Sequence, residues 1–159
     1  NKTIDYTGNI VIDTVLATKI KEAEKNAIEI VPAIALYGEI YIKVIDLALL
    51  LGNALDNAIE ATAKNNSEIE KNIYVTVKLY QDILHIIVKN PVDYPVYIEN
   101  NSITTSKDDN EMHGLGISNM KMLAQKYNGT VDMRCINGYF VLNIVLENEG
   151  EDFDSEMDR

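Results

Sequence analysis

The chain has 159 residues, of which 47% are hydrophobic and 25% are charged, so we expect one globular domain with a real core and at most a short appendage. Its formal net charge of −11 argues against nucleic acid or an anionic membrane as the main partner. It has no secretory signal and no apolar run near the ~18 residues that span a membrane, and it begins with Asn1, so we expect a piece of a longer protein with any membrane segment upstream.

The first part of the chain predicts two helices and a strand. Residues 9–26 carry apolar side chains at helical spacing, which indicates an amphipathic helix. Residues 28–36 are apolar and β-branched, and predict a strand that is interrupted by Pro32. Residues 41–64 predict a long helix, which we expect to be buried because its 44–51 stretch is apolar on nearly all sides.

The second part predicts two hairpins separated by a long loop and a helix. Asn90 and Pro91 are expected to end a strand, because proline cannot donate a hydrogen bond to the ladder. Asn137-Gly138 is a strong signal for the turn of a hairpin. The expected elements are strands at 73–80 and 83–88, a loop at 91–113, a helix at 114–127, and strands at 130–136 and 139–146.

Strand pairs rather than single strands alternate with helices in this order. This order of elements predicts an α/β protein of the α+β kind. We expect a two-layer sandwich with a mixed, mainly antiparallel sheet covered on one face by helices. Residues 147–159 carry seven acids and one base, and we expect them to form a disordered tail. The single Cys135 cannot form an internal disulfide, and we interpret it as a small core residue. His85 is interpreted as a packed or edge residue of its strand.

Two amides lie in the long helix within the segment GNALDNAIEA, residues 52–61. Asn53 and Asn57 are four residues apart and share one helical face, with Asp56 and Glu60 beside them. Asn is a poor helix former, and burying an amide without a partner is unfavourable. Satisfied core or surface amides are one interpretation. The other is a magnesium site, because Mg²⁺ prefers oxygen ligands and often combines few protein ligands with substrate phosphates.

A second signal is Gly114-Leu115-Gly116, which follows a polar loop and opens the predicted helix at 114–127. Glycines let a backbone approach a ligand closely, and the free amides at a helix start bind phosphate. An ordinary tight turn is the alternative interpretation. No GxxxxGK[ST] segment is present, so this is not a Walker A loop.

The two signals and their order resemble a known family. GNALDNAIEA at 52–61, TSK at 105–107 and HGLGISN at 113–119 are similar to the nucleotide-binding domain shared by gyrase-type, heat-shock-90-type, histidine-kinase and mismatch-repair ATPases, the GHKL superfamily. Within it, the chain most resembles sensor histidine kinases of the peptide quorum-sensing type, over about residues 9–146. The resemblance implies a Bergerat-type ATP-binding fold, with ATP and Mg²⁺ as cofactors, in a two-component protein-histidine kinase.

The resemblance also implies roles for the two amides. Asn57 would be the magnesium ligand, and Asn53 would lie where the ATP-hydrolysing relatives carry a glutamate that activates water. An amide cannot take a proton from water at neutral pH. We therefore expect the site to hold ATP for transfer and to hydrolyse it poorly.

The remaining binding residues follow from the same resemblance. Gly114, Leu115, Gly116 and Ile117 would face the phosphates, while Lys107 and His113 would supply positive charge or donors. The DxGxG segment that recognises adenine in most of the superfamily is absent. Asn90 stands at the matching place, and its carbonyl oxygen can accept the hydrogen bond from the adenine amino group. Glu60 replaces a lysine that reaches phosphate in many histidine kinases.

The resemblance implies residues 1–26 as the end of a dimerisation helix and linker and 27–146 as the catalytic domain, which leaves the acidic residues 147–159 as the tail. The phosphoacceptor histidine would lie upstream of Asn1. The full-length protein would be a homodimer, anchored in a bacterial membrane with this domain in the cytoplasm, and would act on a response regulator. Two alternatives are an anti-sigma-type serine/threonine kinase of the same fold and a degenerate dimerisation or docking module.

Overall fold

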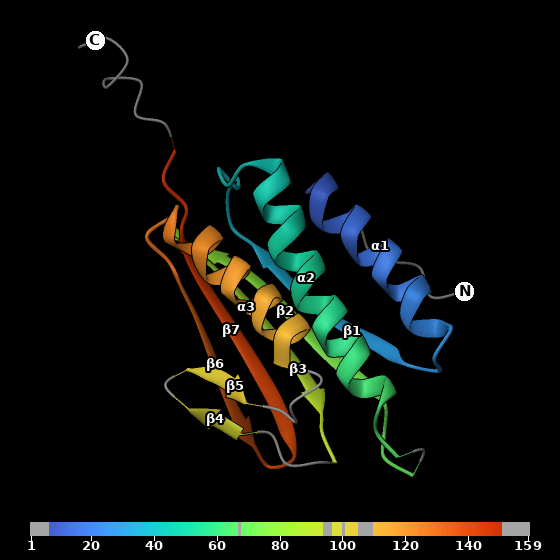
Figure 1. Cartoon of the computed structure of the whole chain (residues 1–159). Coiled ribbons are helices and arrows are strands. Elements are labelled where there is room, and N and C mark those ends of the chain that lie inside the picture. Colours follow the sequence, from blue (N-terminus) through green and yellow to red (C-terminus); the bar gives the residue numbers. More distant parts are fainter. Residues whose placement is uncertain (1–6, 67, 94–96, 100, 105–109, 151–159) are drawn as a thin grey trace, which may run out of the picture.

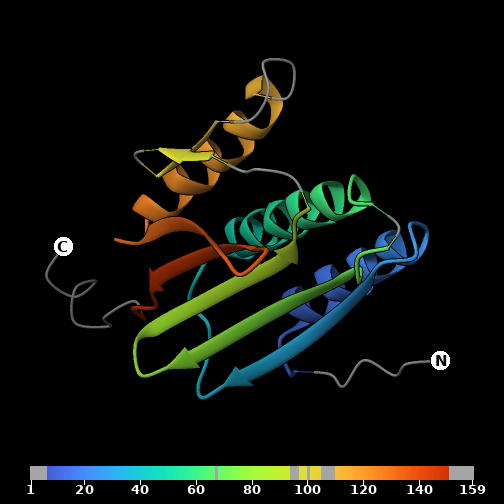
Figure 2. The same ribbon diagram turned by 90° about the horizontal axis from the view of Figure 1, so that it is seen from below.

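The computed structural model describes residues 7–66, 68–93, 97–99, 101–104 and 110–150. A five-stranded sheet forms one layer, and three helices lie side by side over one of its faces (Figures 1 and 2). The helices are α1 (Ile10–Glu24), α2 (Val44–Ala63) and α3 (Asn110–Gln125), and the strands are β1 (Glu29–Leu36), β2 (Asn72–Tyr80), β3 (Ile83–Pro91), β6 (Thr130–Ile136) and β7 (Tyr139–Glu147). None of the helices within those ranges is long and apolar enough to cross a bilayer.

The sheet has the order β1-β2-β3-β7-β6 and is mixed. β1 runs parallel to β2, because α2 connects them as a crossover, whereas the other neighbouring pairs are antiparallel. Asn137 and Gly138 both have positive φ angles, of 49° and 79°, as the tight turn between β6 and β7 requires. The predicted two-layer fold with a mainly antiparallel sheet is confirmed.

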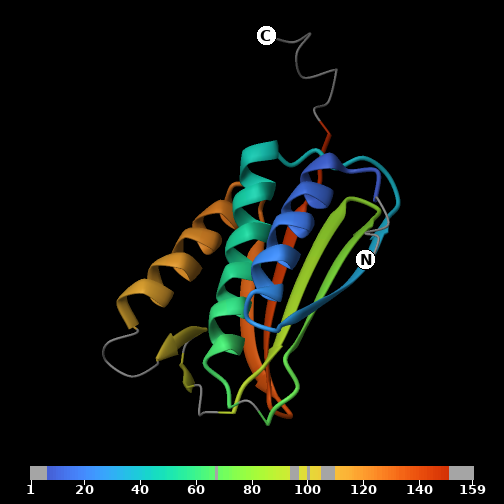
Figure 3. The ribbon, with the colours of Figure 1, turned by 90° about the vertical axis from the view of Figure 1, so that its right-hand side faces the viewer.

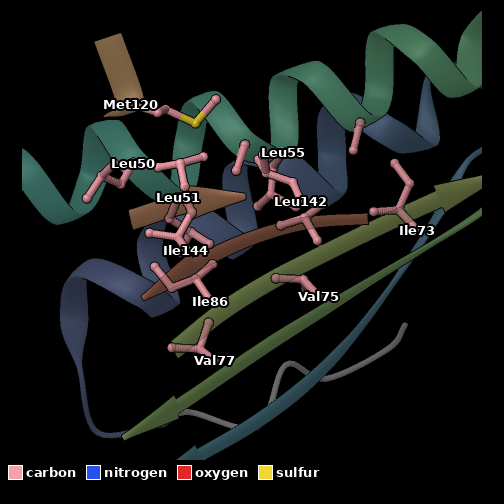
Figure 4. Packing of buried hydrophobic residues seen from close by; sticks show 14 of the residues in the cluster. Leu50, Leu51, Leu55, Ile73, Val75, Val77, Ile86, Met120, Leu142 and Ile144 are labelled. Carbon is pink, nitrogen blue, oxygen red and sulfur yellow. The ribbon is translucent and has the colours of Figure 1, made fainter. Parts of the chain in front are cut away.

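The core lies between the helices and the sheet. Alternate residues of β2, β3 and β7 are buried against α2, as Figure 4 shows for Val75, Ile86 and Ile144. The helix α1 packs beside α2 (Figure 3), and its residues Ile12, Leu16 and Ala23 belong to the same core. The expected domain boundary at residue 26 therefore does not coincide with a boundary of the hydrophobic core. The division into domains otherwise stays a prediction.

Strand β3 extends further than its sequence predicts. Asn90 and Pro91 lie inside it and pair with Phe140 and Tyr139 of β7. The pairing of β3 with β2 has already ended at Lys89. Proline is tolerated at a strand position with a single neighbour, because its missing N–H removes no bond there. The strand therefore does end at Pro91, as expected, but it includes Asn90 and Pro91 and runs three residues past its predicted end at Val88.

The region predicted as a loop, 91–113, contains two short strands, β4 (Tyr97–Glu99) and β5 (Ser102–Thr104), which pair with each other. Asn101, which lies between them, joins this hairpin to the outer edge of β6 by hydrogen bonds. Its Nδ2 donates to the carbonyl of Val131 at 2.8 Å, and its Oδ1 accepts from the amide of Met133 at 3.0 Å. These bonds join residues far apart in sequence, so no local pattern signals them.

Two further expectations are corrected. Cys135 is exposed rather than buried in the core. It shares a face with the buried Val131 and Met133, but it lies near the hairpin turn, where β6 is exposed. The predicted tail begins too early, since Glu147 ends β7 and Asn148 is buried, with its side chain bonded to Tyr41 N and Glu39 O. Residues 151–159 lie outside the described residues.

A buried carboxylate joins the start of α2 to the end of α3. Asp46 accepts a hydrogen bond from Lys126 Nζ at 2.9 Å and another from the hydroxyl of Tyr127. Hydrogen bonds from Lys126 and then from Tyr127 hold the pKa of Asp46 below its ordinary value of 3.8. The network therefore fixes α3 relative to α2.

Replacement of Asp46 by asparagine is expected to lower the free energy of unfolding by about 1–2 kcal/mol at neutral pH, because the charge-assisted hydrogen bonds are lost. The folded state favours the ionised form of Asp46. The difference in free energy of unfolding between wild type and variant is therefore at its full size above pH 3.8, and it disappears as the pH falls through the lowered pKa of Asp46. Urea unfolding between pH 7 and pH 3 measures it. Asp56→Asn is the control, because it breaks a half-exposed ion pair with Lys19 and should cost less than about 1 kcal/mol. Equal losses in the two variants at pH 7 would contradict the assignment.

Candidate functional site

The two amides of α2 lie on the flank of the helix that faces α3. The opposite flank faces α1, where Asp56 Oδ1 lies 2.7 Å from Lys19 Nζ. Asn57 is half-buried, and a β-carbon placed on Gly116 of α3 would lie 3.8 Å from its Oδ1. Asn53, one turn earlier and also half-buried, shares this face. The structure thus brings Asn57 and the glycine segment into direct proximity.

Asn53 and Asn57 are without protein partners within the part of the chain that the structure describes. Neither side chain makes a hydrogen bond or ion pair there. A half-buried amide in this state can still accept a hydrogen bond or coordinate a cation through its oxygen. The described structure therefore gives no support to the interpretation of these residues as satisfied core amides, and the interpretations as surface amides or as a magnesium site both stay predictions.

The glycine segment lies inside α3 rather than at its start. The helix begins at Asn110, so His113, Gly114, Leu115, Gly116 and Ile117 occupy its first two turns. The prediction that Gly114 opens the helix was wrong, because Glu111 and Met112 are good helix formers and extend it. The backbone N–H groups at the start of the helix that lack a helical partner therefore precede Gly114. Ile117 is buried in the core, and Lys107 lies outside the described residues.

Asn90 continues the buried row of β3 that faces the helices. Leu84, Ile86 and Val88 precede it at alternate positions, and Asn90 itself is 2% exposed. Its Nδ2 donates to the carbonyl of Pro91 at 3.2 Å. Because α2 packs against β3, this amide lies on the same side of the sheet as Asn53 and Asn57.

Asn65 links the end of α2 to the end of β3. Its buried side chain donates from Nδ2 to the same Pro91 carbonyl, at 2.6 Å. No pattern in the sequence singles out Asn65, because Pro91 lies 26 residues further along the chain. The structure therefore adds this residue to the surroundings of Asn90.

The remaining polar candidates do not join this group. Glu60 is exposed on α2, and Asp56 is paired with Lys19. His85 lies on the other face of the sheet, where its Nε2 contacts Asn143 Oδ1, so its interpretation as a packed strand residue is confirmed. In the described ranges, no group of three His, Cys, Asp or Glu side chains could hold a metal ion.

A family model described as the GHKL domain matches residues 42–147. The chain belongs to the GHKL domain family. The matched range includes both amides of α2, Asn90 and the glycine segment, so the resemblance read from the sequence motifs is confirmed at this level. No curated protein sequence matches the chain significantly.

Solved structures of histidine kinases share the fold of this GHKL domain. A nucleotide-free form of the catalytic domain of histidine kinase ThkA matches with a TM-score of 0.66 at 18% identity, covering 90% of this chain and 93% of that one. The Acinetobacter baumannii histidine kinase AdeS matches with a TM-score of 0.60 at 14% identity, covering 87% of this chain and 66% of that one. At these identities the likeness shows the fold alone, and the quorum-sensing subgroup stays a prediction.

Proposed function

We propose that this GHKL domain binds Mg-ATP and transfers the γ-phosphate to a histidine outside residues 1–159, as the catalytic domain of a two-component sensor histidine kinase. One observation carries the proposal: two half-buried amides of α2 have no partner in the described structure, and one of them, Asn57, lies against Gly116. Membership of the GHKL family and the fold shared with histidine kinase catalytic domains support it.

The side chain of Asn57 fits a magnesium ligand. It offers a neutral oxygen from a rigid helix, and Mg²⁺ takes oxygen ligands, keeps several waters and commonly completes its shell with substrate phosphates. The absence of a three-residue cluster of acids, histidines or cysteines among the described residues agrees with a metal held mainly by nucleotide and water. When bound, Mg²⁺ would neutralise charge on the phosphates during transfer.

The nucleotide would lie along the flank of α2 between α3 and the end of β3. Gly114, Leu115 and Gly116 would face the phosphates, and Lys107 and His113 would contribute charge or donors to them. Asn90 would accept the hydrogen bond of the adenine amino group. Positioning and charge neutralisation supply most of the catalysis in such transfers.

Asn53 would keep the site from hydrolysing ATP, because an amide has no basic atom to take a proton from water. The phosphoryl group would therefore go to a histidine elsewhere in the full-length protein, and from there to a response regulator. By the same resemblance, the parent protein would be a homodimer, anchored in the membrane with this domain in the cytoplasm.

Isothermal titration calorimetry of the intact domain with ATP tests the proposal. We expect a dissociation constant between about 1 μM and 1 mM with MgCl₂ present, and at least about tenfold weaker binding with EDTA, because Mg²⁺ offsets the repulsion among phosphate charges. Inorganic phosphate is the control ligand. No ATP binding with MgCl₂ present would refute the proposal.

A further inference from the structure

The carbonyl of Pro91 determines which way the Asn90 amide faces. This carbonyl accepts the Nδ2 group of Asn90 at 3.2 Å. If the amide were turned over, its oxygen would meet another oxygen, and neither atom could donate. The Asn90 nitrogen is thus committed to Pro91, while no hydrogen bond of the described structure reaches its Oδ1.

The Pro91 carbonyl is itself held in place from both sides. Asn65 Nδ2 donates to it at 2.6 Å, and the N–H of the same peptide unit, on Val92, donates to Gly138 O at 2.8 Å. Asn65 Oδ1 also accepts from the amide of Asp93 at 3.4 Å. One side chain in the loop after α2 therefore holds the chain where it leaves β3.

The orientation of Asn90 has a chemical consequence. An asparagine offers both an acceptor and a donor, so it can pair with the amino group of adenine or, turned over, with the carbonyl oxygen that guanine carries at that position. With the nitrogen committed to Pro91, only the acceptor is left for a base. Such a site favours a purine with an amino group and rejects one with a carbonyl, since two facing acceptors leave both unpaired.

We propose that Asn65 is a positioning residue that, through the Pro91 carbonyl, keeps the Asn90 oxygen toward the base and so makes the site select adenine over guanine nucleotides. The proposal rests on the proposed function, namely that Mg-ATP binds here with its base at Asn90. In the absence of Asn65, the carbonyl loses its shortest hydrogen bond, and the Asn90 amide can turn over more readily.

The test measures dissociation constants for Mg-ATP and Mg-GTP by calorimetry on four proteins: wild type, Asn65→Leu, Asn90→Asp and the double variant. We expect wild type to prefer ATP by at least about tenfold, equivalent to one hydrogen bond, and Asn65→Leu to reduce that ratio by about three- to tenfold. In Asn90→Asp both oxygens are acceptors, so orientation is irrelevant. The ratio should then stay high and be insensitive to Asn65→Leu.

Asn66→Ala is the matched control, because the Asn66 side chain bonds to the amide of Glu68 rather than to Pro91, and it should leave the ratio unchanged. If Asn65→Leu does not fold, Asn65→Asp replaces it, since a carboxylate keeps the acceptor for Asp93 and removes the donor. An unchanged ratio in the Asn65 variant, or an equal fall in the Asn90→Asp background, would overturn the inference while leaving ATP binding intact. Failure of wild type to bind either nucleotide would overturn the proposed function as well.

Discussion

Replacement of Asn57 by alanine is expected to weaken Mg-ATP binding by about 10- to 100-fold, the loss of roughly one strong polar contact. The amide oxygen lies on a rigid helix beside Gly116, where Asn57 would hold the Mg²⁺ that neutralises phosphate charge. Without this oxygen, water must replace a pre-positioned ligand. Calorimetric titration with ATP at fixed MgCl₂, and with MgCl₂ at fixed ATP, measures the effect, which should be much smaller when EDTA is present.

Two further variants define the cause of that loss. Asn57→Asp keeps an oxygen ligand and should retain magnesium-dependent binding. Asn26→Ala removes an exposed amide in the turn after α1 and should bind ATP as wild type does. Wild-type affinity in Asn57→Ala would show that this residue is not a metal ligand. A loss of the same size in EDTA would point to a structural effect instead.

Introduction of glutamate at Asn53 is expected to raise the rate of ATP hydrolysis by at least about tenfold, since a positioned general base contributes about 10²–10⁴-fold to a rate. Asn53 lies one turn before the proposed metal ligand, on the same face of α2, so a carboxylate there would lie close to a water near the γ-phosphate. Release of inorganic phosphate at saturating Mg-ATP measures the rate. Binding of ATP is checked separately by calorimetry.

Asn53→Gln provides the matched comparison for that result. Glutamine has the length and shape of glutamate but cannot take a proton at neutral pH. We expect its hydrolysis rate to equal that of wild type. If the glutamate and glutamine variants hydrolyse ATP at the same rate while both bind it, the absence of a base at Asn53 is not what limits hydrolysis.

The parts of the fold that local patterns specify were predicted well. α1 and α2 follow from apolar residues at helical spacing, and the β6–β7 hairpin follows from strand alternation on both sides of Asn137-Gly138. The hairpin formed by β4 and β5 was missed, because its anchor, Asn101, binds the edge of β6 about 30 residues away. Cys135 was misplaced because alternation gives the face of a strand, whereas burial also depends on what covers that face.

The sequence by itself determined the family and the residue types of the candidate site, because the motifs of residues 52–61 and 113–119 are specific in content and order. Only the tertiary structure decided which of them meet. It placed Asn57 against Gly116 through the packing of α2 on α3, and it oriented Asn90 through a carbonyl that Asn65 also binds. Hydrogen bonds between distant segments depend on the relative positions of packed helices and strands, which no short window of sequence contains.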